Sequence, residues 1–347
     1  MPTRKALVIG INYAGSDSEL HGAVHDAKQW MQVLTRDFAF RKENIQVMLD
    51  VYPNGDPVED DPFYSVPTKE NMLAAIRWFV SDVREGDSLA FIFCGHMTQI
   101  LDYTNRSGER IEEALCPIDW DEFDGATPYR LITDRELHQL FGQLPDSGVL
   151  LTMVLDASTC SAPLRVPLRR NASYLEREDD NTEVTQAKFN ATFDCKPWLS
   201  SQHVNAIARR VPYKIWRPLW TSLARALKPS FSPPLQEGCA IFCITACGLG
   251  QSALEAWIEG LQQGVLTHCL LQVLEKQQTC SVLEWVQQAN KVANDLRAKV
   301  IPNMDQHFEV SYGRHAGPDE CQMFNPAAAL LAKDRSKRRR GQVFLPT

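Results

Sequence analysis

The sequence predicts an α/β fold in which helices sandwich a mostly parallel central sheet. Runs of apolar, β-branched residues alternate along the chain with segments whose apolar residues recur at helical spacing. The first strand-like run, 6–11, is apolar throughout, as in a strand that is buried on both faces of a sheet. The composition, with 44% hydrophobic and 23% charged residues, is that of an ordinary globular protein. Regular strand–helix alternation favours parallel strands joined by helical crossovers.

The expected elements follow in order along the chain. The predicted strands are the apolar runs 6–11, 44–49, 88–93, 148–155 and 239–246. The predicted helices are 25–34, one that Thr68 caps, 134–141, 265–276 and 282–296.

Residues 1–330 are expected to form one domain, followed by a basic tail at 331–347. A stretch with many prolines and mixed charge, 162–238, reads as a long insertion between the fourth and fifth strands, partly helical at 219–227. The tail carries six basic residues among the eight at 333–340, a candidate nuclear-localisation signal or contact for an anionic surface. The acidic stretch 50–61 is expected to be a solvated loop.

Several classes of protein are excluded at this point. The formal net charge of −7 argues against non-specific binding to nucleic acid, which depends on Lys and Arg neutralising phosphates. No apolar run reaches the roughly 18 residues that a membrane-spanning helix needs, so no membrane association is expected. No secretory signal is recognisable, and the ten cysteines are expected to be reduced thiols in a cytoplasmic or nuclear protein.

Chemistry in a parallel α/β sheet is expected at the carboxyl ends of the strands. Cys94, Gly95 and His96 follow the third strand, and Asp156 closes the fourth, ahead of Ser158. An imidazole beside a nucleophile is the arrangement that acyl transfer requires, because the imidazole moves the proton while backbone N–H groups hold the oxyanion.

The order of short motifs resembles that of type I metacaspases, the caspase-fold peptidases, over about residues 4 to 160. The motifs are KALVIGINY (5–13), LHG (20–22), HDA (25–27), VPT (66–68), FIFCGH (91–96), CPID (116–119), ITD (132–134) and VLD (154–156). The resemblance implies a caspase-hemoglobinase fold in a single peptidase C14 domain, a Cys/His dyad, cleavage after Arg or Lys, and activation by calcium.

The chain departs from this family at the nucleophile. The family has Ser-Gly-His-Gly where this chain has a methionine after His96, and Asp-Xaa-Cys-His-Ser-Gly where this chain reads DASTCS from Asp156. Aligned without a gap, Ser158 stands at the position of the catalytic cysteine. A hydroxyl is far less acidic than a thiol, so Ser158 is expected to attack peptides poorly. A two-residue shift would make Cys160 the nucleophile instead.

The resemblance also implies a substrate pocket. Asp26 and Asp156 match the acidic residues that attract the substrate's Arg or Lys side chain in the family, and Cys94 is placed with them as a substrate-binding candidate. For Asp26 a purely structural role stays open, because a carboxylate at a helix N-terminus is favoured by the helix dipole.

No metal or cofactor is expected. The positions that match the family's calcium aspartates are Glu112, Asp134, Arg135 and Arg165. Two acids and two cations do not make the oxygen-rich cage that calcium needs. Three cysteines on and just after the fifth apolar run (Cys239, Cys243 and Cys247) lack CxxC spacing and are interpreted as buried thiols.

Two functions remain. The first is a pseudo-peptidase that keeps a cleft for Arg- or Lys-containing peptides and acts as a regulator or scaffold. The second is an active cysteine-type endopeptidase that uses Cys160, or Ser158, with His96. Both hypotheses give the chain a peptide or protein as its partner, and the resemblance favours a monomer.

Overall fold

The structure is a computed structural model of the chain. It describes residues 2–52, 56, 58, 63–102, 110–122, 130–145, 147–158, 169–170, 206–209, 238–248, 251–277, 279–302, 304–312 and 321–325.

A central eight-stranded sheet with strand order β3-β2-β1-β4-β8-β11-β14-β9 organises the fold. The first six of these strands are mutually parallel, and β14 is antiparallel to both of its neighbours. The strands are β1 (Arg4–Gly10), β2 (Ile45–Leu49), β3 (Tyr64–Ser65), β4 (Ser88–Cys94), β8 (Ser147–Asp156), β9 (Arg169–Arg170), β11 (Gly238–Thr245) and β14 (Glu309–Tyr312). All seven residues of β4 are buried, as a strand covered on both faces should be.

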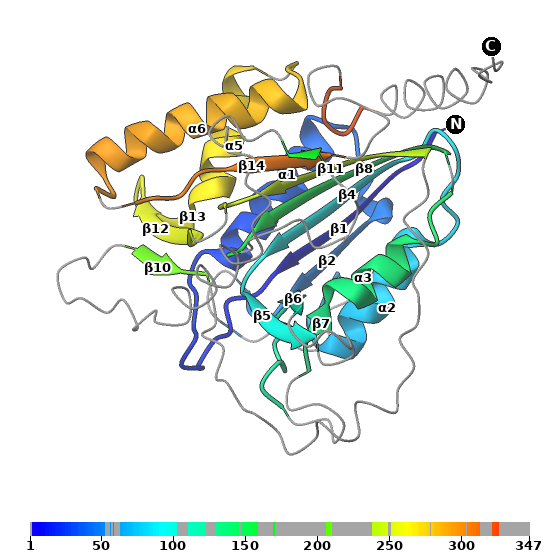
Figure 1. Cartoon of the computed structure of the whole chain (residues 1–347), viewed down its shortest axis with the longest axis horizontal. Coiled ribbons are helices and arrows are strands. Elements are labelled where there is room, and N and C mark those ends of the chain that lie inside the picture. The colour runs from blue at the N-terminus through cyan, green and yellow to red at the C-terminus, as the bar shows by residue number, and fades with distance from the viewer. Residues whose placement is uncertain are drawn as a thin grey trace, which may run out of the picture.

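Helices cover both faces of this sheet (Figure 1). On one face α2 (Lys69–Val80) and α3 (Asp134–Phe141) pack on β4 through contacts among Phe79, Phe91 and Phe141. On the other face α1 (Ala23–Arg36) meets α5 (Val265–Lys276) and α6 (Val282–Lys299). There the Trp30 indole donates to Thr267 and its ring meets Trp285 edge-on. A 3-10 turn, η1 (Lys42–Asn44), leads into β2.

Two small antiparallel sheets complete the described structure. The first contains β5 (Met97–Asp102), β6 (Arg110–Leu115) and β7 (Ile132–Thr133). The second contains β10 (Ala206–Ala208), β12 (Leu254–Ile258) and β13 (Leu261–Gly264), with β12 in the middle. Figure 1 shows both beside the arrowheads of the central strands.

The predicted fold class is confirmed, and each predicted strand and helix that lies in the described ranges has a counterpart in the structure. Thr68 caps α2 by accepting the N–H of Asn71, as its sequence position indicates. The predicted helix at 219–227 and the basic tail at 331–347 lie outside the described residues. In the part of the chain that the structure describes, no helix is both long and apolar enough to cross a membrane.

Candidate functional site

Strand register brings the predicted site residues together at the carboxyl ends of the central strands. Cys94 pairs with Gly10 on one side and with Asp156 on the other, so the last residues of β1, β4 and β8 form one row. His96 and Ser158 each lie two residues beyond this row. The carboxyl-end location that the sequence predicts for these residues is therefore observed.

Backbone groups and one phenol fix His96, which is 2% exposed. Its Nε2 lies 2.7 Å from the carbonyl oxygen of Ser18, to which a protonated Nε2 donates. The backbone N–H of His96 donates to the Tyr13 hydroxyl at 2.9 Å, and the two rings lie 4.7 Å apart. Burial lowers the pKa of His96 to about 4, against the raising effect of the Ser18 and Arg209 carbonyls. The imidazole is therefore neutral near pH 7, with its Nε2 already engaged.

Tyr13 is held by a turn that the sequence alone did not reveal. Asp50 accepts the backbone N–H groups of Asn12 and Ala14, and it is only 8% exposed. The expectation of a solvated loop is therefore wrong for Asp50, because its carboxylate is needed inside to satisfy these two donors. The Tyr13 hydroxyl in turn donates to the carbonyl of Cys116 at 2.6 Å.

Ser158 follows β8 and is 9% exposed. Its Oγ accepts the backbone N–H of Ala253 at 2.9 Å and lies 3.5 Å from the Ala253 carbonyl oxygen. The backbone N–H of Ser158 donates to the carbonyl of Arg209 at 3.1 Å. No hydrogen bond joins the Ser158 hydroxyl to His96, although both residues are described.

Asp26 and Asp156 do come together, and a third acid joins them around one buried cation. The Arg209 guanidinium lies 2.5 Å from Asp26 Oδ2, 3.2 Å from Asp156 Oδ1 and 3.4 Å from Glu255 Oε2. All four side chains are fully buried. We call Asp26, Asp156 and Glu255 the acidic pocket. Each acid comes from a different element, respectively α1, β8 and β12.

Backbone donors complete the acidic pocket. Asp26 accepts the N–H of Gly264 at 2.8 Å, and Asp156 accepts the N–H of Thr267, at the start of α5, at 2.8 Å. Glu255 accepts the N–H groups of His21 and Gly22. Asp26 lies in the first turn of α1, as a structural role requires, and its carboxylate also contacts the guanidinium of the chain's own Arg209.

The charges of the pocket do not balance, because three carboxyl groups face one guanidinium. Burial raises the pKa of Asp26 to about 7, an effect that Arg209 opposes and Asp156 reinforces. Burial alone would lower the pKa of Arg209, but the three carboxylates raise it by more than burial lowers it. The pKa of Arg209 therefore lies above its usual range, and the guanidinium stays charged.

Sequence reasoning missed Arg209, Glu255 and Gly264. Arg209 lies in the predicted insertion, and nothing in its neighbourhood distinguishes it from Arg210. Glu255 is the inward-facing acid of a strand that was not predicted. A Cβ on Gly264 would lie 2.2 Å from Asp156 Oδ2 and 2.6 Å from Arg209 Nη1, so only glycine fits there. The position of Gly264, directly before the helix predicted at 265–276, was the one available signal.

Cys94 is fully buried beneath the pocket, where burial raises the pKa of its thiol. It lies close enough to Asp26 and Asp156 for their charges to raise this pKa further. Cys160 lies outside the described residues. Cys239, Cys243 and Cys247 are buried, in line with their interpretation as core thiols.

Two of the four positions that match the family's calcium aspartates have described side chains. Of the four positions, Asp134 and Arg135 open α3, while Arg165 and the Glu112 side chain lie outside the described residues. Within the described ranges no three His, Cys, Asp or Glu side chains form a metal-binding group. A carboxylate followed by a cation does not suit a hard dication such as calcium.

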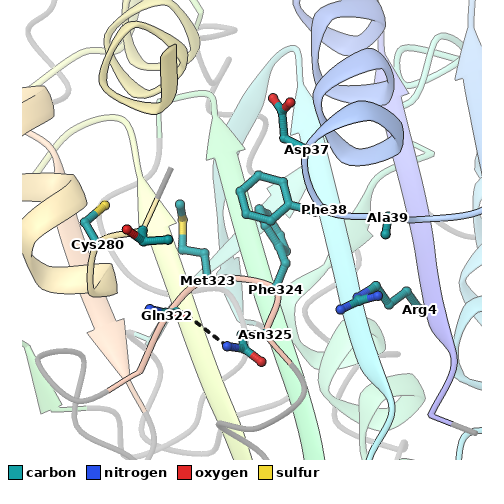
Figure 2. A pocket seen from close by; sticks show the side chains of 10 residues that line it. Arg4, Asp37, Phe38, Ala39, Cys280, Gln322, Met323, Phe324 and Asn325 are labelled. Carbon is teal, nitrogen blue, oxygen red and sulfur yellow. Dashed lines mark hydrogen bonds between the residues drawn. The ribbon is translucent and has the colours of Figure 1, made fainter. Parts of the chain in front are cut away.

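A separate cavity of about 280 Å³ lies at the amino end of β1 (Figure 2). Arg4, at the start of β1, lines it together with Phe38, Cys280, Met323 and Phe324. Because β1 starts there and ends at the row that contains Cys94, this cavity is remote from His96 and Ser158.

Comparison with known proteins gives one consistent family. Residues 4–167 match the family model described as metacaspase, peptidase C14 domain. Metacaspase-1 of Sclerotinia sclerotiorum is 32% identical over 47% of this chain and 35% of its own length. Metacaspase-1 of Saccharomyces cerevisiae is 25% identical over 83% of this chain and 63% of its own. The matches thus span about a third to two thirds of these relatives.

A solved structure, protein GSU0716 from Geobacter sulfurreducens, matches with a TM-score of 0.56 and 18% identity, over 93% of this chain and 99% of that one. At this identity the likeness concerns the fold alone. The family match and the parallel sheet with its two helical layers together give a caspase-hemoglobinase α/β fold. Over residues 4–167 the chain is therefore similar to metacaspases.

Proposed function

We propose that this metacaspase-type chain is a pseudo-peptidase whose cleft binds an arginine-bearing peptide segment and which acts as a regulator or scaffold. The observation that carries the proposal is the contrast at the ends of β4 and β8. A guanidinium is held by three acids, while the hydroxyl beside it hydrogen-bonds to Ala253 and not to His96. We infer from this contrast that the site still recognises arginine while the hydroxyl of Ser158 is not activated.

The chemistry of Ser158 supports the loss of activity. A serine hydroxyl attacks a peptide only when an adjacent base takes its proton, and the two groups must lie within hydrogen-bond reach. Ser158 Oγ is engaged by a backbone N–H instead. Met97, in place of the family's glycine after His96, is fully buried at the start of β5.

The acidic pocket supports the choice of ligand. Arginine presents several N–H donors in a planar fork, so one guanidinium can satisfy several carboxylates, as Arg209 does here. A lysine ammonium also carries the required charge, but it is a point charge without that fork. We therefore propose arginine as the preferred residue and lysine as the weaker one.

The test is hydrolysis of fluorogenic peptides with Arg or Lys before the cleaved bond, with and without millimolar calcium. We expect the wild-type chain to be inactive and Ser158→Cys to gain hydrolysis that His96→Ala abolishes. Cys160→Ala is the matched control, because it removes a thiol two residues away. Wild-type hydrolysis that Cys160→Ala eliminates would contradict the proposal and establish the active peptidase with a displaced nucleophile.

A further inference from the structure

The segment that supplies Arg209 is bound as a peptide ligand would be. Among the described residues β10 pairs with β12 alone, in antiparallel register with Ile207 opposite Glu255, and so forms the edge of its sheet. The N–H of Arg209 continues the ladder by donating to the carbonyl of Ala253 at 2.8 Å. Addition of an extended segment to a sheet edge is a common mode of peptide recognition, in which the main chain gives affinity and a pocket gives specificity.

The side chain and the carbonyl of Arg209 point to the two parts of the candidate site. The guanidinium fills the acidic pocket. The carbonyl accepts the N–H of Ser158 at 3.1 Å and lies near enough to His96 to raise its pKa. A backbone N–H at the nucleophile position, aimed at a carbonyl oxygen, is the donor that an oxyanion site uses.

We infer that residues 206–209 are a resident ligand of the cleft, bound in the register of a substrate with the carbonyl of Arg209 presented to residue 158. The inference rests on the proposed function and deepens it. The cleft selects an extended peptide that ends in arginine, and this chain supplies such a peptide itself. An external partner must therefore displace the resident segment before it can bind.

The first experiment restores a thiol in the full-length chain and follows its intact mass. In Ser158→Cys the imidazole of His96 takes the proton of the thiol, and the thiolate sulfur attacks the carbonyl carbon of Arg209. The protonated His96 then gives that proton to the leaving nitrogen of residue 210 as the C–N bond breaks. Water then hydrolyses the Arg209 thioester to a carboxylate and returns the thiol. The expected products are 1–209 and 210–347, formed at a rate that does not depend on protein concentration.

Adjacent arginines provide the matched control. Adding Arg209→Gln to Ser158→Cys should abolish this cut, whereas adding Arg210→Gln should leave it. A cut at another bond overturns the inference. So does a Ser158→Cys chain that stays intact yet hydrolyses external arginine peptides, although that result would leave the proposed function standing.

The second measurement follows peptide binding and does not depend on peptide cleavage. A labelled peptide, acetyl-Ala-Ile-Ala-Arg-amide, is titrated into the wild-type chain and into Arg209→Gln. A tethered segment acts at an effective concentration on the order of millimolar, so wild type should bind the peptide at least about tenfold more weakly than the variant. Asp26→Asn added to Arg209→Gln should weaken that binding again. Equal binding by wild type and Arg209→Gln overturns the inference.

If Arg209→Gln does not fold, amide hydrogen exchange on the wild-type chain takes its place. Exchange of residues 206–209 should become faster when the same peptide is added in excess, because the bound segment is displaced. Peptide that binds without changing this exchange occupies another site and overturns the inference. If Ser158→Cys neither cuts itself nor hydrolyses peptides, these binding results still decide about residues 206–209, while the proposed cleft chemistry fails on its own.

Discussion

The acidic pocket and the His96–Ser158 pair are neighbours at the carboxyl ends of the same strands. They differ in whether their side chains act on a common partner or on each other. Each acid in the pocket contacts the Arg209 guanidinium and accepts at least one backbone N–H. His96 and Ser158 each bond to the backbone of another segment, Ser18 and Ala253, rather than to each other. The side chains of the three acids and those of His96 and Ser158 thus have separate hydrogen-bond partners, so one set can work without the other. The link between them is the Arg209 carbonyl, which accepts the N–H of Ser158.

The largest expected effect comes from breaking the pocket. Arg209→Gln leaves three buried carboxyl groups without their cation, so we expect the free energy of unfolding to fall by about 3–5 kcal/mol. Denaturant unfolding followed by circular dichroism measures it. Arg36→Gln is the control, because that side chain is 64% exposed and its ion pair with Asp37 should contribute less than about 1 kcal/mol. Equal effects of the two variants would show that Arg209 is not in the pocket.

The pH dependence of stability sharpens the comparison, because folding shifts the pKa values of Asp26 and His96 in opposite directions. Folding raises the pKa of Asp26 from 3.8 to about 7, so the stability from this group is full below pH 4 and is lost as pH rises toward 7. Folding lowers the pKa of His96 from 6.5 to about 4, so its stability is full above pH 6.5 and is lost as pH falls toward 4.

Difference measurements separate these two effects, each on the order of 3 kcal/mol. Between pH 4 and 6.5 the stability of wild type relative to Asp26→Asn should fall as pH rises. Relative to His96→Gln it should rise over the same range. Chemical unfolding at several pH values provides both curves, and two curves of the same sign would refute the assignment.

A smaller loss in the free energy of unfolding is expected when a methyl group is added at Gly264, which lines the acidic pocket. Gly264→Ala places a methyl group against Asp156 and Arg209, and overpacking of this kind costs about 1–3 kcal/mol. The backbone of Gly264 has a φ of −69°, which alanine adopts without strain, so the cost reports the contact alone. Thermal unfolding measures it, and an unchanged Tm would mean that the pocket is wider than described.

The smallest effect concerns Ser158. Ser158→Ala removes the acceptor for the Ala253 N–H and should cost about 1 kcal/mol in the free energy of unfolding. Because Ser158 is inactive in our account, this variant should show the same lack of peptide hydrolysis as wild type. Measurable activity in wild type that Ser158→Ala removes would make Ser158 a true nucleophile.

The central strands and their flanking helices could be predicted because their signals are local. Continuous apolar runs such as 88–93 and capping residues such as Thr68 determine their own elements. The strand-end positions of His96, Asp156 and Ser158 followed from the parallel topology. Asp26 joined them through the family resemblance, since only its helical position was readable locally.

The pocket's cation and third acid could not be predicted, because they depend on pairing between distant segments. β10 has three residues and becomes a strand only against β12, about fifty residues later in the chain. Glu255 and Gly264 acquire their roles from the same pairing. Asp50 was misread for a related reason: an acidic stretch reads as solvated unless its distant partners, the N–H groups of Asn12 and Ala14, are known.

Hydrogen exchange at Arg209 in the unmodified chain tests the central claim most directly. The Arg209 N–H donates to Ala253, and the strand it continues lies in the same sheet as β12. We predict that amides at 206–209 exchange about as slowly as those of β12, because their opening requires the buried guanidinium to leave three acids. Exchange at the rate of an unstructured peptide would show that the acidic pocket is not occupied by this chain, and would contradict the account.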